Sequence, residues 1–93
     1  MNPVENFKID NYKEILREIE KLGKLEFLRE LEERIIQEIG SLVHEGSDEA
    51  REKLDKLERS INDELEFVPR NRFLISALKN SILGAIAAAK FSL

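Results

Sequence analysis

The most apolar stretch of the chain is residues 73–93, in which the large apolar side chains recur every three or four positions. Because an α-helix has 3.6 residues per turn, this spacing places them on one face of a helix. The apolar stripe contains Ile75, Leu78, Ile82, Ile86, Ala89 and Leu93. A second stripe of small residues contains Ala77, Ser81, Gly84 and Ala88. A helix that can pack on two sides is normally covered on both, so we predict a central helix with a close contact at Gly84. The contacting element is either an earlier helix or a second copy of the chain.

Two further periodic stretches, 10–22 and 24–44, precede this helix and are separated by Gly23. Either Gly23 breaks the chain into two helices or one long helix wraps around its partners. We favour the break, because glycine costs about 1 kcal/mol inside a helix. Gly40 lies in a strongly periodic context, so we expect the helix to continue through it and Gly40 to mark a close helix approach.

The next turn has clear helix-capping residues. Gly46 suits a left-handed helix end and Ser47 suits the start of the next helix, over 48–67. That helix has one narrow apolar seam at coiled-coil spacing, with charged residues on its other faces. Pro69 then marks the join to the last helix, over 70–91. The seam includes Ala50, Leu54, Leu57, Ile61, Leu65 and Val68.

Short joins between helices of similar length are typical of an up-down bundle. We therefore predict a single all-α domain over 1–93, with three long helices, a shorter N-terminal helix and an irregular arm at 1–9. Apolar surface on every helix predicts that a homodimer completes the bundle. The residues expected to form its packing and interface surfaces are Leu54, Leu57, Ile61, Leu65, Ile75, Leu78, Ile82, Gly84 and Ile86.

The composition narrows the class of protein. Charged residues make up 37% of the chain and there is no cysteine, which excludes disulfides and thiolate sites. The net charge of -4 argues against a general nucleic-acid coat protein. Polar residues at 79–81 interrupt the last apolar stretch, so we expect a buried helix rather than a membrane span. The chain has no signal-peptide pattern, and we expect a cytoplasmic protein with a thermophile-like composition.

Candidate chemistry is sparse. The single histidine, His44, lies near a helix end and has no Glu-x-x-His partner, which excludes a di-iron bundle. No serine has a recognisable histidine and acid arrangement, so we predict no catalytic residue, metal ligand or cofactor. Cationic side chains are the remaining candidates for binding an anion or another protein. They are Arg17, Arg34, Arg51, Arg70 and Arg72.

The segment EIGSLVHEGSDEAREKLDKL, residues 38–57, resembles the all-helical chorismate mutases. The Asp-x-x-Arg-Glu start of the second helix in that family matches residues 48–52, and Arg17 and Arg34 are similar to the arginines of its long helix. The resemblance implies an enzyme in which cationic groups from several helices hold a dicarboxylate and stabilise charge on its ether oxygen.

The active-site pattern of that family is incomplete in this chain. Val43 or His44 falls near the position of its lysine, and the only glutamine, Gln37, is not on the last helix. A fainter outline resembles the helical domain of archaeal GINS replication subunits, through Glu26-Phe27 and the arginine-rich start at 70–75. Size and a mid-chain glycine turn are also similar to helical-hairpin secretion substrates.

Two function classes follow from these patterns. The first is a non-enzymatic helical protein–protein interaction module, acting as a homo-oligomer or as a small subunit or regulator of a larger assembly. The second is a small helical enzyme or anion-binding protein that uses Arg17, Arg34, Arg51 and Arg70. A pocket shared by these arginines would favour the second class. The expected partner is a second copy or another protein, rather than nucleic acid or a membrane.

Overall fold

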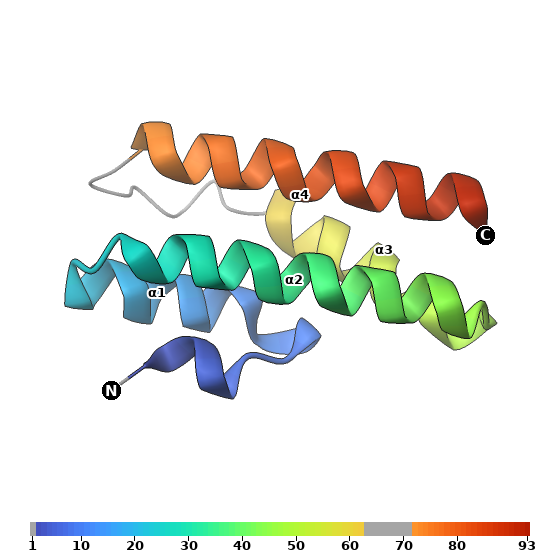
Figure 1. Cartoon of the computed structure of the whole chain (residues 1–93), viewed down its shortest axis with the longest axis horizontal. Helices are drawn as coiled ribbons and strands as arrows, with labels where there is room; N and C mark the ends of the chain where they lie inside the picture. Colours follow the sequence, from blue (N-terminus) through green and yellow to red (C-terminus); the bar gives the residue numbers. More distant parts are fainter. Residues whose placement is uncertain (1, 63–71) are drawn as a thin grey trace.

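A computed structural model describes residues 2–62 and 72–93, and these residues form four α-helices packed against one another (Figure 1). Within these two ranges the chain is helical apart from short joins, and no strand is present. The all-α class predicted from the periodicity is confirmed. The helices are α1 (Tyr12–Leu22), α2 (Glu26–Glu45), α3 (Asp48–Asn62) and α4 (Arg72–Ser92).

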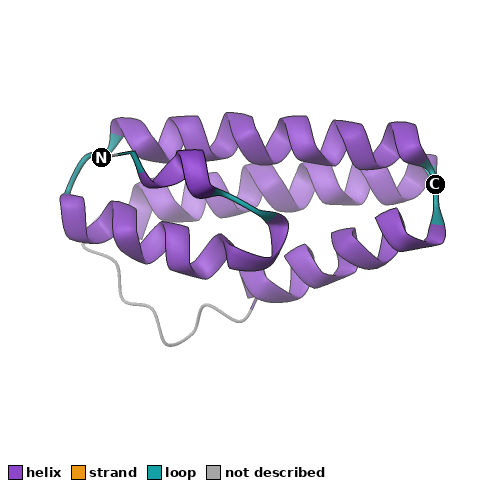
Figure 2. Ribbon diagram, turned by 90° about the horizontal axis from the view of Figure 1, so that it is seen from below, coloured by secondary structure: helices purple, strands orange, loops and turns teal. Residues whose placement is uncertain are grey.

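The N-terminal arm is more ordered than its sequence suggests. It forms two short 3-10 turns, η1 (Pro3–Asn6) and η2 (Ile9–Asn11), and η1 packs against both α1 and α2 (Figure 2). The Asn2 side chain accepts a 3.0 Å hydrogen bond from the Val4 N–H and donates one of 2.6 Å to Glu30 on α2. Asparagine side chains commonly bond to nearby backbone in this way, which favours turns over an irregular chain.

Two glycines with positive φ separate the first three helices. Gly23 has φ 67° and Gly46 has φ 65°, and each donates its N–H to a carbonyl of the preceding turn. Residues with a Cβ rarely adopt this left-handed conformation, so both positions favour glycine. The chain therefore breaks at Gly23. Beyond Gly46, the Ser47 hydroxyl accepts a 3.1 Å hydrogen bond from the Ala50 N–H and caps α3.

The apolar stripes of all four helices meet in one core. The described part of the predicted seam, on α3, is completely buried, with Leu54, Leu57 and Ile61 each 0% exposed, and Val68 lies outside the described residues. The apolar stripe of α4 is also buried from Ile75 to Ala89, Leu93 is partly buried, and most large apolar side chains of α1 and α2 are buried as well. Apart from the Tyr12 hydroxyl, no polar or charged side-chain group in the described ranges is fully buried, so the core is almost wholly apolar. Of the predicted packing residues, Leu54, Leu57, Ile61, Ile75, Leu78, Ile82 and Ile86 lie in this core, Gly84 does not, and Leu65 lies outside the described residues.

Within the described residues of one chain, the last helix is not covered on both sides, so no earlier helix makes the close contact predicted at Gly84. Helix α4 packs mainly on α2 and also on α3, and its opposite side faces outward (Figure 1). Gly84 is exposed, and a Cβ added there would meet no atom within 4 Å. The same holds for Gly40 on α2, so the close approach expected there is also absent. The earlier helices in the described ranges therefore do not cover the small-residue stripe.

Candidate interaction surface

Two phenylalanines project from the outer side of α4. Phe73 is 88% exposed and Phe91 is 96% exposed, although phenylalanine is among the residues most often buried. Phe91 follows Phe73 by 18 residues, a separation of about five helical turns and about 27 Å. A whole number of turns places both rings on one line along the helix. Ile82, midway between them and 0% exposed, points in the opposite direction.

Along the line that joins the two rings, the residues between them are small or polar and are exposed. Starting from Phe73, the steps along this line are four, three, four, three and four residues, which is the spacing of a coiled-coil seam. We call these six residues the outer stripe. It consists of Phe73, Ala77, Asn80, Gly84, Ala87 and Phe91.

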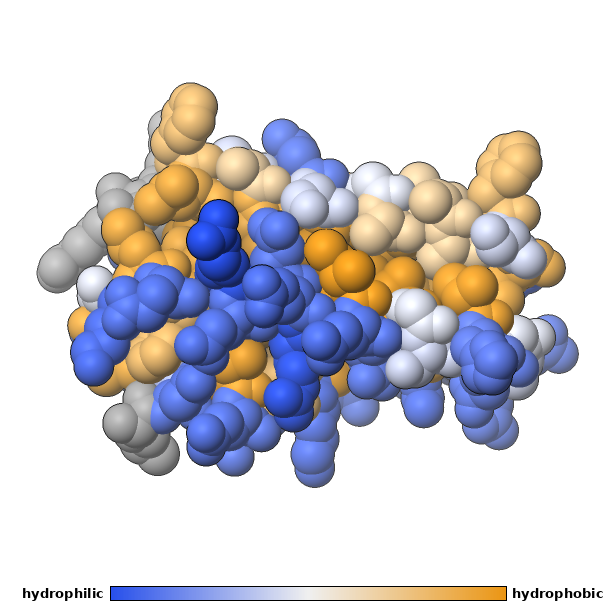
Figure 3. All heavy atoms as spheres, viewed as in Figure 1, coloured by the Kyte–Doolittle hydropathy of each residue, from blue (hydrophilic) through white to orange (hydrophobic). Residues whose placement is uncertain are grey.

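The outer stripe lies in the least charged part of the molecule. Residues 73–93 contain no acid, and Lys79 and Lys90 are their only charges. In the view of Figure 3, apolar and weakly polar side chains follow most of α4 along the upper edge, and polar side chains gather over α2. Large exposed apolar side chains away from charge are typical of binding surfaces.

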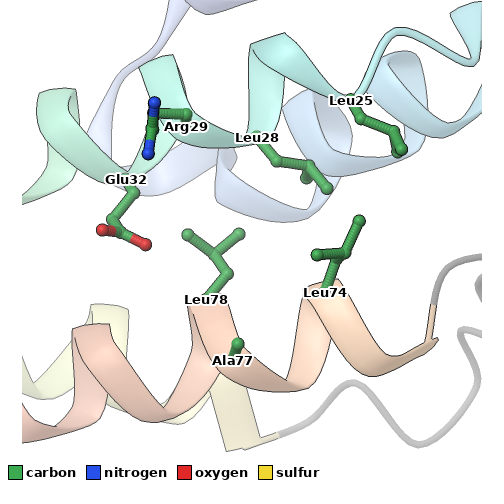
Figure 4. Close-up of a pocket in the computed structure, with 7 residues that line it drawn as sticks. All are labelled: Leu25, Leu28, Arg29, Glu32, Leu74, Ala77 and Leu78. Atoms are coloured by element: carbon green, nitrogen blue, oxygen red, sulfur yellow. The ribbon is translucent and has the colours of Figure 1, made fainter.

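An apolar groove between α2 and α4 opens beside one end of this stripe (Figure 4). It has a volume of about 240 Å³, and Leu25 and Leu74 face one another across it. These two side chains are 42% and 46% exposed, so the groove is only partly filled by the chain itself. The lining residues are Leu25, Leu28, Arg29, Glu32, Leu74, Ala77 and Leu78. Ala77 belongs to both the groove and the outer stripe.

An ion pair fastens the other end of α4 to α3. The Lys90 ammonium binds Asp55 and lies 3.0 Å from the Glu58 carboxylate. The hydrogen bond from Lys90 lowers the pKa of Asp55 below its ordinary value of 3.8, against a smaller opposing effect of desolvation. Hydrogen bonds to Asp55 and then Glu58 raise the pKa of Lys90 above 10.5. Each charge therefore stabilises the other, and α4 is held with its outer stripe facing away from α3.

The structure places the predicted arginines on different elements. Arg17 is exposed on α1, Arg34 on α2 and Arg51 on α3. Arg72 is the first residue of α4, and Arg70 lies outside the described residues. The acidic cluster at 63–66 also falls outside them.

Of the three described arginine side chains, Arg34 lines a shallow groove of about 300 Å³ between the arm, α2 and α3. Lys8 and Lys53 add positive charge there, but Asp10 and Glu38 line the same groove. Arg17 and Arg51 do not line it. The groove has mixed charge and offers no concentrated site for a dianion.

Sequence reasoning did not identify the two phenylalanines of the outer stripe. Both lie half a turn around the helix from the buried stripe, so the periodic pattern of the core does not include them. The signal that could have found them is their separation by 18 residues, which puts two large apolar side chains on a line otherwise made of small and polar residues.

In the ranges 2–62 and 72–93, no three histidine, aspartate or glutamate side chains gather so that they could hold a metal ion. By length and composition alone, Phe73–Ser92 is apolar enough to cross a membrane, a property shared with core helices of soluble proteins. Comparison of the chain with protein-family models, curated proteins and solved structures finds no match.

Proposed function

We propose that this chain is an up-down helical bundle that works as a non-enzymatic protein–protein interaction module. In this proposal it acts as a homo-oligomer or as a small subunit or regulator of a larger assembly, and the outer stripe of α4 is its binding surface. The observation that carries the proposal is the exposure of Phe73 and Phe91, at 88% and 96%.

The energetics of these two side chains favour a partner. Burying a phenylalanine side chain is worth about 2 kcal/mol relative to leaving it in water. In the isolated chain both rings face water and do not obtain this favourable free energy. The small residues along the line between them leave room for a close neighbour. Because aromatic side chains are enriched in protein interfaces, a protein surface is the occupant that fits them best.

The enzyme alternative has weaker support. An enzyme resembling the chorismate mutases needs several cationic side chains around one dicarboxylate. Arg34 lies in a groove together with two acids, and Arg17 and Arg51 project from other elements. We therefore do not propose that activity for the chain.

Site-specific photocrosslinking in the cells that make the protein tests the proposed function. A benzophenone amino acid would replace Phe91, and a matched chain would carry it at Glu52, which is exposed on α3. The proposal predicts a protein adduct at position 91, identified by mass spectrometry, that the chain labelled at position 52 does not form. Equal labelling at both positions, or adducts with lipid alone, would contradict it.

A further inference from the structure

Apart from its central pair, Asn80 and Gly84, the outer stripe has the same residues in both directions along α4. Residue 82 is the midpoint of the pairs 73 and 91, 77 and 87, and 80 and 84. Reversing the helix about that midpoint exchanges phenylalanine with phenylalanine and alanine with alanine, and it sets Asn80 opposite Gly84. A two-fold interface packs one patch against a second copy of itself, and this near-symmetry sets large side chains opposite large ones and alanine opposite alanine.

We propose that the partner of the outer stripe is a second copy of this chain, with its α4 antiparallel to the first and the two-fold axis at the level of residue 82. The inference rests on the proposed function and names the partner and its orientation. Each copy places its Phe91 beside the other copy's Phe73.

The sizes of the side chains suit this arrangement. Gly84 and the alanines at 77 and 87 lie in the middle of the stripe, where small residues let two helices approach closely. The two phenylalanines lie at its ends, where a ring can extend past the neighbouring helix. At the level of residue 73 the groove lined by Leu25 and Leu74 opens beside the stripe.

The outer stripe exposes a large part of the apolar area that a stable dimer buries. A buried phenylalanine contributes about 150–250 Å², so the four rings of a dimer supply about 600–1,000 Å². Stable interfaces bury about 1,200–2,000 Å² in total. Leu74, the three small residues of the stripe and Ala88 on each copy provide further exposed surface beside the rings.

The charges favour the antiparallel orientation over the parallel one. A parallel pair would set each Lys79 and each Lys90 beside its own counterpart. The antiparallel pair separates the two Lys79 levels by about 9 Å and the two Lys90 levels by about 24 Å. It also opposes the two helix dipoles, whose like ends would be adjacent in a parallel pair.

A lipid bilayer is the competing occupant, because Phe73–Ser92 has the length and composition to cross one. Asn80 disfavours insertion, since its amide would lie at the centre of the surface facing the hydrocarbon. In the antiparallel pair the same amide faces the space above the second copy's Gly84.

Cysteine crosslinking tests the orientation directly, because the natural chain contains no cysteine. Chains carrying Ala77→Cys or Ala87→Cys would be oxidised separately and as an equal mixture, then compared by non-reducing electrophoresis. The antiparallel pair brings position 77 level with position 87 of the other copy. Identical positions are separated by about 15 Å along the axis, too far for a disulfide, whose Cα atoms lie within about 7 Å. The expected result is a dimer band from the mixture alone, at least tenfold stronger than from either chain by itself.

Sedimentation equilibrium of the unmodified chain, with Gly84→Leu as the disrupting variant, completes the test. The expected result is a dimer at micromolar concentration, weakened at least tenfold by Gly84→Leu while the circular dichroism spectrum stays helical. Gly40→Leu is the matched control, because Gly40 is also exposed but lies on α2. Crosslinking of each single-cysteine chain with itself would overturn the antiparallel orientation.

A monomer in sedimentation with no crosslink from the mixture would overturn the second copy as partner. A second test mixes the chain with vesicles of phosphatidylcholine and phosphatidylglycerol and measures whether it floats with them. Flotation that is lost on Phe91→Ser would show that the outer stripe binds a bilayer, and it would also overturn the inference. If the chain is monomeric yet position 91 photocrosslinks to a different protein, the proposed function holds and only the inference fails. If position 91 forms no photocrosslinked adduct and the chain forms no dimer, both the proposed function and the inference fail.

Discussion

Lys90 of α4 donates a 3.0 Å hydrogen bond to Glu58 of α3. It also binds Asp55, which lies about one turn before Glu58 on α3. This bridge joins residues that are 32 positions apart in the sequence. It sets α4 against α3 at the end of α4 far from Phe73. Its contribution to stability depends on both charges being present.

Removing this bridge should flatten the pH dependence of stability. The pKa of Asp55 is depressed, so its contribution is present above about 3.8 and is lost as the pH falls through the lower folded value. The pKa of Lys90 is raised, so its contribution is present below about 10.5 and is lost as the pH rises through the higher folded value.

We expect Lys90→Met to lower stability modestly between these limits. Outside them, the stability of the variant should approach that of the natural chain. Urea midpoints from pH 3 to pH 11 measure this, with Lys53→Met on exposed α3 surface as control. Parallel curves for the natural chain and Lys90→Met would contradict the assignment.

The exposed helical glycine on α2 should tolerate a side chain. Gly40→Ala is expected to raise the free energy of unfolding by up to about 1 kcal/mol, because alanine is the better helix former and its Cβ meets no atom within 4 Å. The matched substitution Gly23→Ala should lower stability by about 1 kcal/mol, since Gly23 has φ 67°. Denaturant melts of the two variants should shift in opposite directions, and a loss of stability in both would refute the open space at Gly40.

The buried side of α4 should dominate the stability of its packing. Ile82→Ala is expected to cost about 2–5 kcal/mol, because Ile82 is 0% exposed in the core. The control is Ile36→Ala on α2, where the side chain is 42% exposed and the loss should be well under half as large. Thermal unfolding at equal protein concentration separates the two cases. Similar losses at both positions would place Ile82 outside the core.

The start of α3 should depend on one hydroxyl. Ser47→Ala removes the acceptor of the 3.1 Å hydrogen bond from the Ala50 N–H and should cost about 1 kcal/mol. Ser41→Ala, at an exposed position within α2, serves as the control and should change stability little. Chemical denaturation gives both values, and a Ser47→Ala chain as stable as the natural one would mean that water replaces the cap.

The buried part of the fold follows closely from apolar periodicity. The periodicity predicts one stripe that contains Ile75, Leu78, Ile82 and Ile86, and all four residues lie in the core. Burial of large aliphatic side chains is the main driving force of folding, so their spacing determines which side of each helix turns inward.

The outward side of α4 could not be predicted in the same way. Alanine, serine and glycine fit a close helix contact and a solvent-facing surface equally well, so the stripe through Gly84 carried no information about burial. Whether a helix has neighbours on one side or two depends on how the other helices are arranged around it. The separation of Phe73 and Phe91 was the available clue, but it identifies a shared line on the helix and not its occupant.

The position of α4 as the last of the four helices also affects how the chain is made. A ribosome completes α1, α2 and α3 before α4 has left the exit tunnel, so the side of α2 that α4 later covers is open to water during synthesis. Leu28 on that helix lines the groove together with Leu74 and Leu78 of α4, and it is nearly buried in the complete structure. The first three helices carry most of the charge of the chain, so we expect them to keep this incomplete chain in solution until α4 covers the open side of α2.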